Sequence, residues 1–286
     1  MISVIITSAN EKKTLLKALN RVIKNLKELT LENWEILIVS PDKESGEMVK
    51  DINNPKIKFL KDKGEGKPAA LNQAFKKVTG DLIILTDGDV YIEDKSIYYI
   101  LNLLNKKNVG AVTGRPVSIL KKSNIFGYWS YFLTNAAHQM RLKNNSFPCS
   151  GYLYGIKNVI PEIPENSLAD DGVITKKLRD KGLRVKYQPK AIVYVKYPNN
   201  FKDWLKQKVR STGGYLQDQT SKDRSFFQEI RQGIKLFFSY PNNLKEYFWT
   251  FLLYLGRIYL WLLIFWNIKI KNKDFKKIWQ RIESTK

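Results

Sequence analysis

Residues 82–89 read LIILTDGD and carry the strongest structural signal in the chain. Four apolar residues in a row are typical of a strand that is buried on both faces of a sheet. Asp87 and Asp89 follow at the carboxyl end of that strand, where ligands bind in open α/β sheets. Two carboxylates separated by one glycine suit a hard cation, Mg²⁺ or Mn²⁺, that also contacts phosphates. The same tripeptide is common in surface turns, so its place after a strand is what favours a metal site.

The sequence around this stretch alternates between strand-like and helix-like patterns. Apolar runs predict strands at residues 2–7, 35–39, 57–60 and 82–86. Apolar residues at helical spacing predict a helix that Asn10 caps, and a second helix over residues 70–78 that ends at Gly80. Such alternation predicts an α/β fold in which helices flank a sheet.

The second half of the chain is less regular. Its patterns predict helices over residues 126–142, 171–181 and 201–211, with Gly213 and Gly214 stopping the last one, a loop of small residues at 147–155, and strands at 183–187 and 191–195. A chain of 286 residues with 43% apolar content can bury a full core. This length predicts one large domain with an appendage.

Cys149 and His138 are the only cysteine and histidine in the sequence. They cannot form an intramolecular disulfide or build a structural zinc site between them. Nothing in the sequence places a third, orienting group beside them, so we interpret both as packing residues rather than a nucleophile pair. The free thiol indicates a reducing, cytosol-facing location, and the opening strand-like run has no signal-peptide pattern.

The net charge is +22, which calls for an anionic partner: nucleic acid, phosphorylated metabolites or an anionic membrane. Residues 201–286 hold 17 Lys and Arg against 7 Asp and Glu, and they also contain the longest apolar and aromatic run. Basic and strongly apolar sequence together are typical of a membrane-surface segment. A nucleic-acid groove calls instead for aromatics spaced among basic residues on a polar face, so nucleic acid is the disfavoured partner.

Residues 64–67, GEGK, form a flexible loop before the second predicted helix. They lack the spacing of a dinucleotide fingerprint and the Ser or Thr that follows Lys in a Walker-type phosphate loop. Two interpretations stay open: a solvated turn, or a loop that brings Lys67 near a donor phosphate.

The order of the motifs resembles glycosyltransferase family 2, whose members have the GT-A fold, and in particular its polysaccharide-synthase-like members. The resemblance covers roughly residues 1–215. It rests on SVIITSANE (3–11), Gly66-Lys67, Ala70-Leu71-Asn72, Gly80-Asp81, DGD (87–89), VTGR (112–115), Ser150-Gly151, ADD (169–171) and QKVRS (207–211).

This resemblance implies a nucleotide diphosphate sugar donor, expected to be UDP-linked, and the hydroxyl of a glycan or glycolipid as acceptor. It implies that Asp171, beside Asp170, is the catalytic base, and that Asp89 and Asp87 hold Mg²⁺ or Mn²⁺. The residues implied for nucleotide-sugar binding are Thr7, Ala9, Glu11, Asp42, Lys67, Asn72, Asp87, Gln207 and Arg210, and those for the acceptor are Ser150, Gly151 and Trp204. A single displacement at the anomeric carbon would invert its configuration.

Two positions depart from the family pattern. Ser40-Pro41-Asp42 stands where the family has two aspartates after the second strand, so Asp42 only partly replaces the usual contact to the nucleobase. Ser211 stands where the QxxRW motif has Trp, which removes an aromatic platform for a sugar. We therefore favour transfer of one or a few sugars over polymerisation. Trp204 shares a helix face with Gln207 and Arg210, as a stacking surface or as a core residue.

Residues 248–268 form a 21-residue segment whose strongly polar members are Arg257 and Asn267. At about 1.5 Å per residue it is long enough to cross a hydrocarbon layer of roughly 30 Å. A single span would place the catalytic domain and the tail on opposite sides of the membrane. The donor chemistry requires the domain in the cytosol, and the five lysines in residues 269–277 favour the cytosol for the tail as well. Arg257 would also be costly at the centre of a span. We favour an interfacial or re-entrant helix at the cytoplasmic face of the cell membrane, with residues 226–240 as its amphipathic partner, over a span or an oligomer contact.

The expected organisation is a GT-A catalytic domain at residues 1–215 and a helical, membrane-associated segment at 216–286. Three rival functions stay open: a nucleotidyltransferase of similar fold, a lipid-phosphate sugar synthase, and a non-enzymatic basic protein that binds nucleic acid or membranes. The sequence does not specify the donor sugar, the nucleobase, the acceptor or the linkage.

Overall fold

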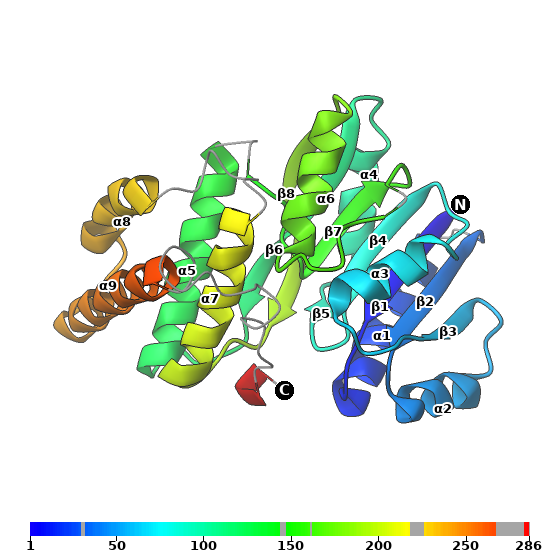
Figure 1. Ribbon diagram of the computed structural model, residues 1–286, viewed down its shortest axis with the longest axis horizontal. Helices are drawn as coiled ribbons and strands as arrows, with labels where there is room; N and C mark the ends of the chain where they lie inside the picture. Colours follow the sequence, from blue (N-terminus) through cyan, green and yellow to red (C-terminus); the bar gives the residue numbers. More distant parts are fainter. Residues whose placement is uncertain (30–31, 144–146, 161, 218–225, 267–282, 286) are drawn as a thin grey trace.

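The computed structural model describes residues 1–29, 32–143, 147–160, 162–217, 226–266 and 283–285. In these residues an eight-stranded sheet runs in the order β3-β2-β1-β4-β7-β6-β8-β5. Its strands are β1 (Ile2–Thr7), β2 (Trp34–Ser40), β3 (Ile57–Lys61), β4 (Leu82–Asp87), β5 (Tyr91–Ile92), β6 (Val109–Ser118), β7 (Leu153–Lys157) and β8 (Arg184–Val195). The α/β prediction is therefore confirmed, and Figure 1 shows this sheet in one half of the molecule.

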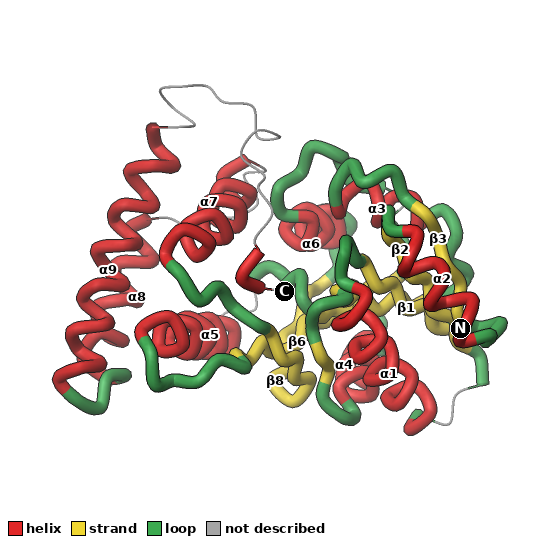
Figure 2. The backbone as a smooth tube through the Cα atoms, turned by 90° about the horizontal axis from the view of Figure 1, so that it is seen from below, coloured by secondary structure: helices red, strands yellow, loops and turns green. Residues whose placement is uncertain are grey.

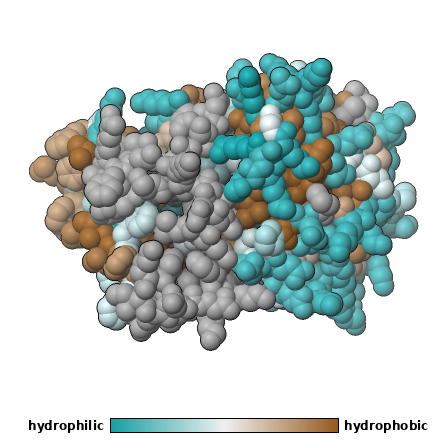
Figure 3. All heavy atoms as spheres, turned by 45° about the horizontal axis from the view of Figure 1, so that its top comes forward, coloured by the Kyte–Doolittle hydropathy of each residue, from teal (hydrophilic) through white to brown (hydrophobic). Residues whose placement is uncertain are grey.

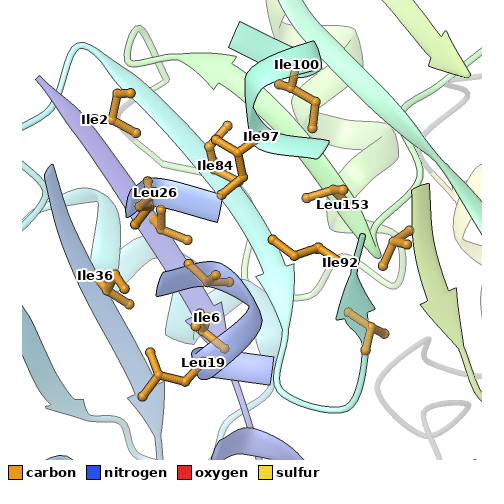
Figure 4. Packing of buried hydrophobic residues seen from close by; sticks show 14 of the residues in the cluster. Ile2, Ile6, Leu19, Leu26, Ile36, Ile84, Ile92, Ile97, Ile100 and Leu153 are labelled. Atoms are coloured by element: carbon orange, nitrogen blue, oxygen red, sulfur yellow. The ribbon is translucent and has the colours of Figure 1, made fainter. Parts of the chain in front are cut away.

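Helices cover both faces of the sheet (Figure 2). One layer holds α1 (Lys12–Glu28), α2 (Lys43–Ile52) and α4 (Ser96–Leu104), and the opposite layer holds α3 (Lys67–Phe75) and α6 (Asp170–Asp180). Successive side chains of a strand point to opposite faces, so Val4 and Ile6 of β1 pack in the first layer and Ile5 packs in the second. Figure 4 shows the first of these cores, in which Ile6 and Ile36 of the sheet lie against Leu19 and Leu26 of α1.

The parallel part of the sheet determines where polar side chains gather. Strand β1 pairs in parallel with β2 on one side and with β4 on the other, and Thr7 is the register partner of Asp87. Strand β7 then pairs antiparallel with both β4 and β6, which makes the sheet mixed. The chain leaves β1 and β4 at the same edge, so the turns that follow these two strands lie together.

Glu35 is a buried carboxylate at the far end of this sheet, with only 2% of its side chain exposed. It accepts hydrogen bonds from the Ser3 hydroxyl (2.7 Å), the Thr79 amide and hydroxyl (both 2.8 Å) and Lys58 Nζ (2.8 Å). Burial alone raises the pKa of Glu35, but the four hydrogen bonds outweigh it and lower the pKa from 4.5 to about 2. The ionised form therefore ties β1, β2, β3 and the loop before β4 together.

We expect Glu35→Gln to lower the free energy of unfolding by roughly 1–3 kcal/mol at neutral pH, because strong hydrogen bonds to a charged acceptor are lost. The folded pKa lies below the unfolded one, so this stabilisation is complete above pH 4.5 and disappears as the pH falls toward 2. Urea titrations at several pH values should show that the free energies of unfolding of the wild type and Glu35→Gln become equal as the pH falls. The exposed control Glu47→Gln should have the same free energy of unfolding as the wild type at every pH. A difference between Glu35→Gln and the wild type that does not change with pH would show that the ionised form of Glu35 is not the source of the stabilisation.

The second half of the molecule is a helical layer beside the sheet. It contains α5 (Ile125–Lys143), α7 (Phe201–Gln217), α8 (Phe226–Ser239) and α9 (Leu244–Phe265), which lie together in Figures 1 and 2. Aromatic side chains form its core: the Trp204 ring lies 5.2 Å from Trp129 and 5.7 Å from Phe201, and Tyr128 donates or accepts a 2.6 Å hydrogen bond with Thr250 of α9. Helix α9 is thus packed onto the same layer as α5 and α7. The predicted boundary between residues 215 and 216 falls inside α7.

Helix α9 is long and apolar enough to cross a membrane, and its side chains divide into two faces. Leu253, Gly256, Leu260 and Ile264 are buried against neighbouring helices. The opposite side of α9 carries a row of exposed apolar residues, here called the outer stripe: Leu244, Phe248, Phe251, Leu255, Tyr259, Leu262 and Phe265. Each of them is at least 47% exposed. Figure 3 shows hydrophobic side chains gathered at the end of the molecule that α8 and α9 form.

Four local predictions were wrong. The loop predicted at residues 147–155 ends earlier, because Leu153–Lys157 forms β7, which pairs with β4 and β6. Residues 183–187 and 191–195 form the single strand β8, because both segments pair with β6 across an irregular register. Asn10 does not cap α1. Glu11 takes the N-cap position, where its side chain forms no capping hydrogen bond to the helix, and Asn10 is left-handed (φ 53°) with its N–H donated to Asp42. Gly213 and Gly214 do not stop α7, which continues to Gln217. The part of the predicted apolar segment beyond residue 266 lies outside the described residues.

Candidate active site

A cavity of about 960 Å³ opens at the carboxyl ends of β1 and β4 and continues along α5, α6, α7 and α9. Most of the predicted site residues line it: Thr7, Ala9, Glu11, Lys67, Asp87, Asp89, Ser150, Gly151, Asp170, Asp171, Gln207 and Arg210. They come from separate stretches of sequence that are far apart along the chain. The topology therefore gathers most of the predicted site into one place.

The two aspartates of the DGD turn lie beside the end of β1. Thr7 donates a 2.9 Å hydrogen bond from its hydroxyl to Asp87 Oδ1, as their pairing in the sheet allows. Gly88 lies so close to Ser8 that a Cβ at this position would be 2.8 Å from the Ser8 hydroxyl. The glycine thus lets the turn fold tightly over β1. Burial, followed by the charges of Asp87 and Glu11, raises the pKa of Asp89 to about 8.

The chemistry of this donor set fits a hard divalent cation. Asp89 and Asp87 supply carboxylate oxygens. The pKa of Asp89 is raised by burial and then by the neighbouring negative charges, and a bound cation would offset both effects. Within the described parts of the chain, no three His, Cys, Asp or Glu side chains are grouped closely enough to hold a metal alone. Mg²⁺ and Mn²⁺ commonly complete their coordination with waters and substrate phosphates, so two carboxylates are sufficient.

Lys67, at the start of α3, lies between the two acidic pairs. Its Nζ is 2.6 Å from Asp87 Oδ1 and 3.7 Å from Asp170 Oδ2, and it donates a 3.2 Å hydrogen bond to the Gly151 carbonyl. Burial lowers the pKa of Lys67, but the charges of Asp170 and Asp87 more than reverse this, so its pKa is raised and the side chain stays cationic. Lys67 is therefore a fixed positive charge within the cavity.

Asp171 occupies the first turn of α6, where the helix dipole stabilises negative charge. Its two carboxylate oxygens accept 2.8 Å hydrogen bonds from the Gly151 and Gly172 amides. Burial and the neighbouring Asp170 charge nevertheless raise the pKa of Asp171 to about 6. A carboxylate with this pKa is ionised at neutral pH and accepts a proton more readily than an ordinary aspartate.

Helix α7 supplies Gln207 and Arg210 to the cavity and approaches α6 very closely. Gln207 Nε2 lies 3.4 Å from the Tyr152 hydroxyl, and Gln207 Oε1 is buried without a partner among the described residues. A Cβ at Gly214 would lie 2.7 Å from Ala169 Cβ and 2.9 Å from the Ala169 amide nitrogen. This contact explains why glycine is found inside the helix: only glycine lets α7 pack against the segment that carries Asp170 and Asp171.

We expect Gly214→Ala to reduce the rate of the reaction at this site roughly 10- to 100-fold, because separating α7 from Ala169 displaces the adjacent carboxylates. Gly213→Ala is the matched control: its Cβ would meet only Leu168 Cδ1 at 3.8 Å, an ordinary contact, and alanine favours the helix. Steady-state rates of both variants test this. Equal activity of the two variants would show that the close approach does not position the site.

Three predicted residues do not line the cavity. Asn72 is buried, and its amide forms two hydrogen bonds with the Ile163 backbone, 2.7 and 2.8 Å long. Trp204 is 3% exposed within the aromatic core, which corresponds to its interpretation as a core residue. Asp42 lies behind the turn after β1, where its carboxylate accepts hydrogen bonds from the Asn10 amide and the Ser40 hydroxyl.

The cavity also contains residues that the sequence did not single out. Tyr152 directly follows Ser150-Gly151, contacts Gln207 and packs against Tyr197, so its adjacency to a motif was an available signal. Arg141 had no such signal among 49 basic residues.

Cys149 is fully buried, and burial raises its pKa to about 12. The side chain is therefore a neutral thiol, which supports its interpretation as a packing residue.

Comparison with known proteins gives three findings. A model described as glycosyl transferase family 2 matches residues 3–163. The probable glycosyltransferase YdaM of Bacillus subtilis (strain 168) is 24% identical over 233 residues, covering 74% of this chain and 54% of its own. The poly-beta-1,6-N-acetyl-D-glucosamine synthase of Staphylococcus aureus (strain COL) is 26% identical over 275 residues, covering 89% and 64%. The chain thus spans between half and two thirds of these relatives.

A solved structure shares the fold. The mannosyltransferase PcManGT from Pyrobaculum calidifontis, in complex with GDP-Man and Mn²⁺, superposes with a TM-score of 0.58 at 14% identity, covering 97% of this chain and 82% of that one. At this identity the likeness concerns the fold alone, and it confirms the predicted GT-A architecture.

Proposed function

The chain belongs to glycosyltransferase family 2, and from this premise we propose that it is an inverting enzyme that moves a sugar from a nucleotide diphosphate donor to an acceptor hydroxyl. One observation carries the proposal: a single cavity contains the Asp87–Asp89 turn and the Asp170–Asp171 pair, with Lys67 between them. One acidic group is thus available for the donor and the other for a proton transfer.

The donor side is formed by the turn after β1, by Lys67 and by Arg210. Thr7, Ala9 and Glu11 line the cavity next to Asp87, a position suited to a nucleoside, which we expect to be uridine. Asp89 and Asp87 would hold Mg²⁺ or Mn²⁺, which when bound neutralises charge on a diphosphate leaving group. Lys67 and Arg210 add fixed positive charge, and the guanidinium of Arg210 can grip phosphate oxygens at two points.

The acceptor side is formed by Ser150, Gly151 and Asp171. In the proposed step the acceptor oxygen forms a bond to the anomeric carbon while the bond from that carbon to the diphosphate oxygen breaks, and the acceptor proton passes to Asp171. The hydrogen bond from the Gly151 amide holds one oxygen of this carboxylate in place. Attack from the face opposite the leaving group inverts the configuration. A nucleotidyltransferase has no use for this second carboxylate pair, which favours sugar transfer.

The direct test is a panel of nucleotide sugars with Mn²⁺, assayed for release of the nucleotide diphosphate. We expect release from at least one uridine diphosphate sugar, and its loss when EDTA removes the metal. Diphosphate release from a nucleoside triphosphate and a sugar phosphate, with no turnover of any nucleotide sugar, would contradict the proposal and identify a nucleotidyltransferase.

We infer that α9 attaches the protein to the cytoplasmic face of an anionic membrane. One face of α9 is packed against α5 and α7, and its outer stripe is exposed, which is the arrangement of a helix that lies in the membrane interface with its apolar face toward lipid. Arg257 lines the cavity and is not part of that stripe, so it does not oppose contact with lipid. The lysines of residues 269–277 add attraction to acidic headgroups.

We expect the protein to sediment with vesicles containing acidic phospholipid, and Leu262→Glu to weaken this clearly, because the charge falls in the outer stripe, where Leu262 is 63% exposed. Tyr98→Glu makes the same change of charge at an exposed aromatic residue of α4 and should sediment like the wild type. If the wild type does not sediment with the vesicles but self-associates, and Leu262→Glu makes the protein monomeric, membrane attachment is contradicted. The outer stripe is then a contact between copies of the protein.

A further inference from the structure

A second group of polar residues, two of them arginines, lies apart from the donor motifs, between α5 and the sheet. It consists of Arg141 and His138 of α5, Arg115 of β6 and Tyr187 of β8, here called the α5 basic cluster. His138 Nδ1 and the Tyr187 hydroxyl are 2.7 Å apart. The Arg141 guanidinium lies over the Phe147 and Tyr187 rings, 5.7 and 6.0 Å from their centres. The aromatic rings thus hold a planar cation in a fixed orientation.

Arg141 is a buried cation without a counter-ion among the described residues. It is 9% exposed, lines the cavity, and its Nε has no hydrogen-bond partner in the same part of the chain. No carboxylate that the structure describes lies within ion-pair distance of Arg141 or Arg115. Burying a charge without a partner is costly, so an arrangement of this kind favours a bound anion.

The electrostatics of the neighbouring groups agree with this. Burial, together with the charges of Arg115 and Arg141, lowers the pKa of His138, so its ring is neutral at neutral pH. The cluster therefore owes its positive charge to its two arginines. Their guanidinium groups match the oxygens of a phosphate.

The cluster lies on the acceptor side of the cavity. Arg141 and Asp171 both act electrostatically on Cys149, the residue that precedes Ser150-Gly151, whereas the donor motifs follow β1 and β4. The cavity that Arg141 lines also has an apolar part, here called the α5–α9 wall: Phe132, Leu133 and Met140 of α5 and Leu253 and Ile258 of α9. Ile258 is also 49% exposed, so this wall reaches the surface beside the outer stripe of α9. One cavity thus combines a buried cation with an apolar wall, of which Ile258 is exposed beside the outer stripe of α9.

We propose that the acceptor is a lipid-linked saccharide whose phosphate is bound by Arg141, with the positive charge of Arg115 nearby, and whose hydrocarbon chain follows the α5–α9 wall. This inference rests on the proposed sugar transfer, since it identifies the acceptor of that reaction. It also gives the buried arginine a partner and gives the apolar arm of the cavity an occupant. The hydroxyl that attacks the donor then belongs to the saccharide attached to the phosphate.

The test is the binding of three probes, farnesyl phosphate, farnesol and inorganic phosphate, measured by calorimetry. We expect farnesyl phosphate to bind most tightly and Arg141→Met to weaken it roughly 10- to 100-fold, as expected when charge-assisted hydrogen bonds are lost. Farnesol binding should be unaffected. Arg115→Gln, at a half-buried position, is a second variant that does not empty a buried site, and the exposed Arg184→Gln of β8 is the matched control.

Each other outcome overturns a definite part of the proposal. Equal binding of farnesyl phosphate by the wild type, Arg141→Met and Arg115→Gln would remove the phosphate site. If inorganic phosphate binds as tightly as farnesyl phosphate, the hydrocarbon chain contributes nothing and the proposed lipid site is wrong. If farnesol binds as tightly as farnesyl phosphate, the phosphate contributes nothing and the proposed phosphate site is wrong. Mn²⁺-dependent binding of nucleotide is measured on the same wild-type sample. If the wild type binds no nucleotide, the proposed function is contradicted. If it binds nucleotide but not farnesyl phosphate, only the inference about the acceptor is contradicted.

Discussion

Asp171→Asn should lower the rate of sugar transfer by a factor on the order of 10² to 10⁴, the usual contribution of a general base, while nucleotide binding stays close to that of the wild type. Asparagine keeps the volume of the side chain and can still accept the hydrogen bond from the Gly151 amide, but it cannot take the acceptor proton. If the aspartate served only to start α6, the change would matter little, because an uncharged polar residue is tolerated there. Near-normal transfer in Asp171→Asn would therefore refute the assignment.

The pH dependence gives an independent measure. The base must be ionised to act, and its pKa is about 6, so kcat/KM should rise with pH through this region and level off above it. Opposing influences act on Asp171: burial and the Asp170 charge raise its pKa, and Lys67 together with the Gly172 and Gly151 amides lowers it. Asp170→Asn removes a like charge, so the acidic limb of the profile should move to lower pH while the plateau is largely kept. An unchanged profile in Asp170→Asn would show that the limb belongs to another group.

Asp89→Asn should weaken Mn²⁺-dependent nucleotide binding by more than roughly 100-fold, because even substitutions outside the direct ligands of a metal cost 10- to 100-fold. The change removes a negative charge from a crowded carboxylate pair, so the protein should fold at least as well as the wild type. Calorimetric titration of the nucleotide with and without Mn²⁺ separates loss of the metal from loss of the nucleotide pocket.

The matched control for this experiment is Asp180→Asn, which removes an exposed carboxylate at the end of α6, outside the cavity. Its nucleotide affinity should depend on Mn²⁺ like that of the wild type. Should Asp89→Asn keep full Mn²⁺-dependent binding, the metal site lies elsewhere in the cavity.

The sequence by itself determined the first half of the fold and predicted where the candidate site lies. Strands at residues 2–7, 35–39 and 82–86 were predictable because a strand buried on both faces consists mainly of apolar residues, which is a local property. The edge strand at 57–60 is partly exposed and has a weaker pattern. Chain direction then placed the turns after β1 and β4, and with them Asp87 and Asp89, at one edge of the sheet. The order of the motifs along the chain added Asp170 and Asp171 to the same site.

The tertiary structure decided everything that depends on how closely two distant segments approach. Glycines at 213 and 214 indicate a helix stop when only their neighbours in sequence are considered, but the contact of Gly214 with Ala169 makes them part of a continuous helix. Asn72 belongs to a motif of the site, yet its amide is used by the Ile163 backbone. Arg141 is one of many basic residues until packing buries it away from every described carboxylate. Propensity and periodicity act over a few residues, whereas burial, cavity lining and ion pairing depend on contacts that only the assembled layers create.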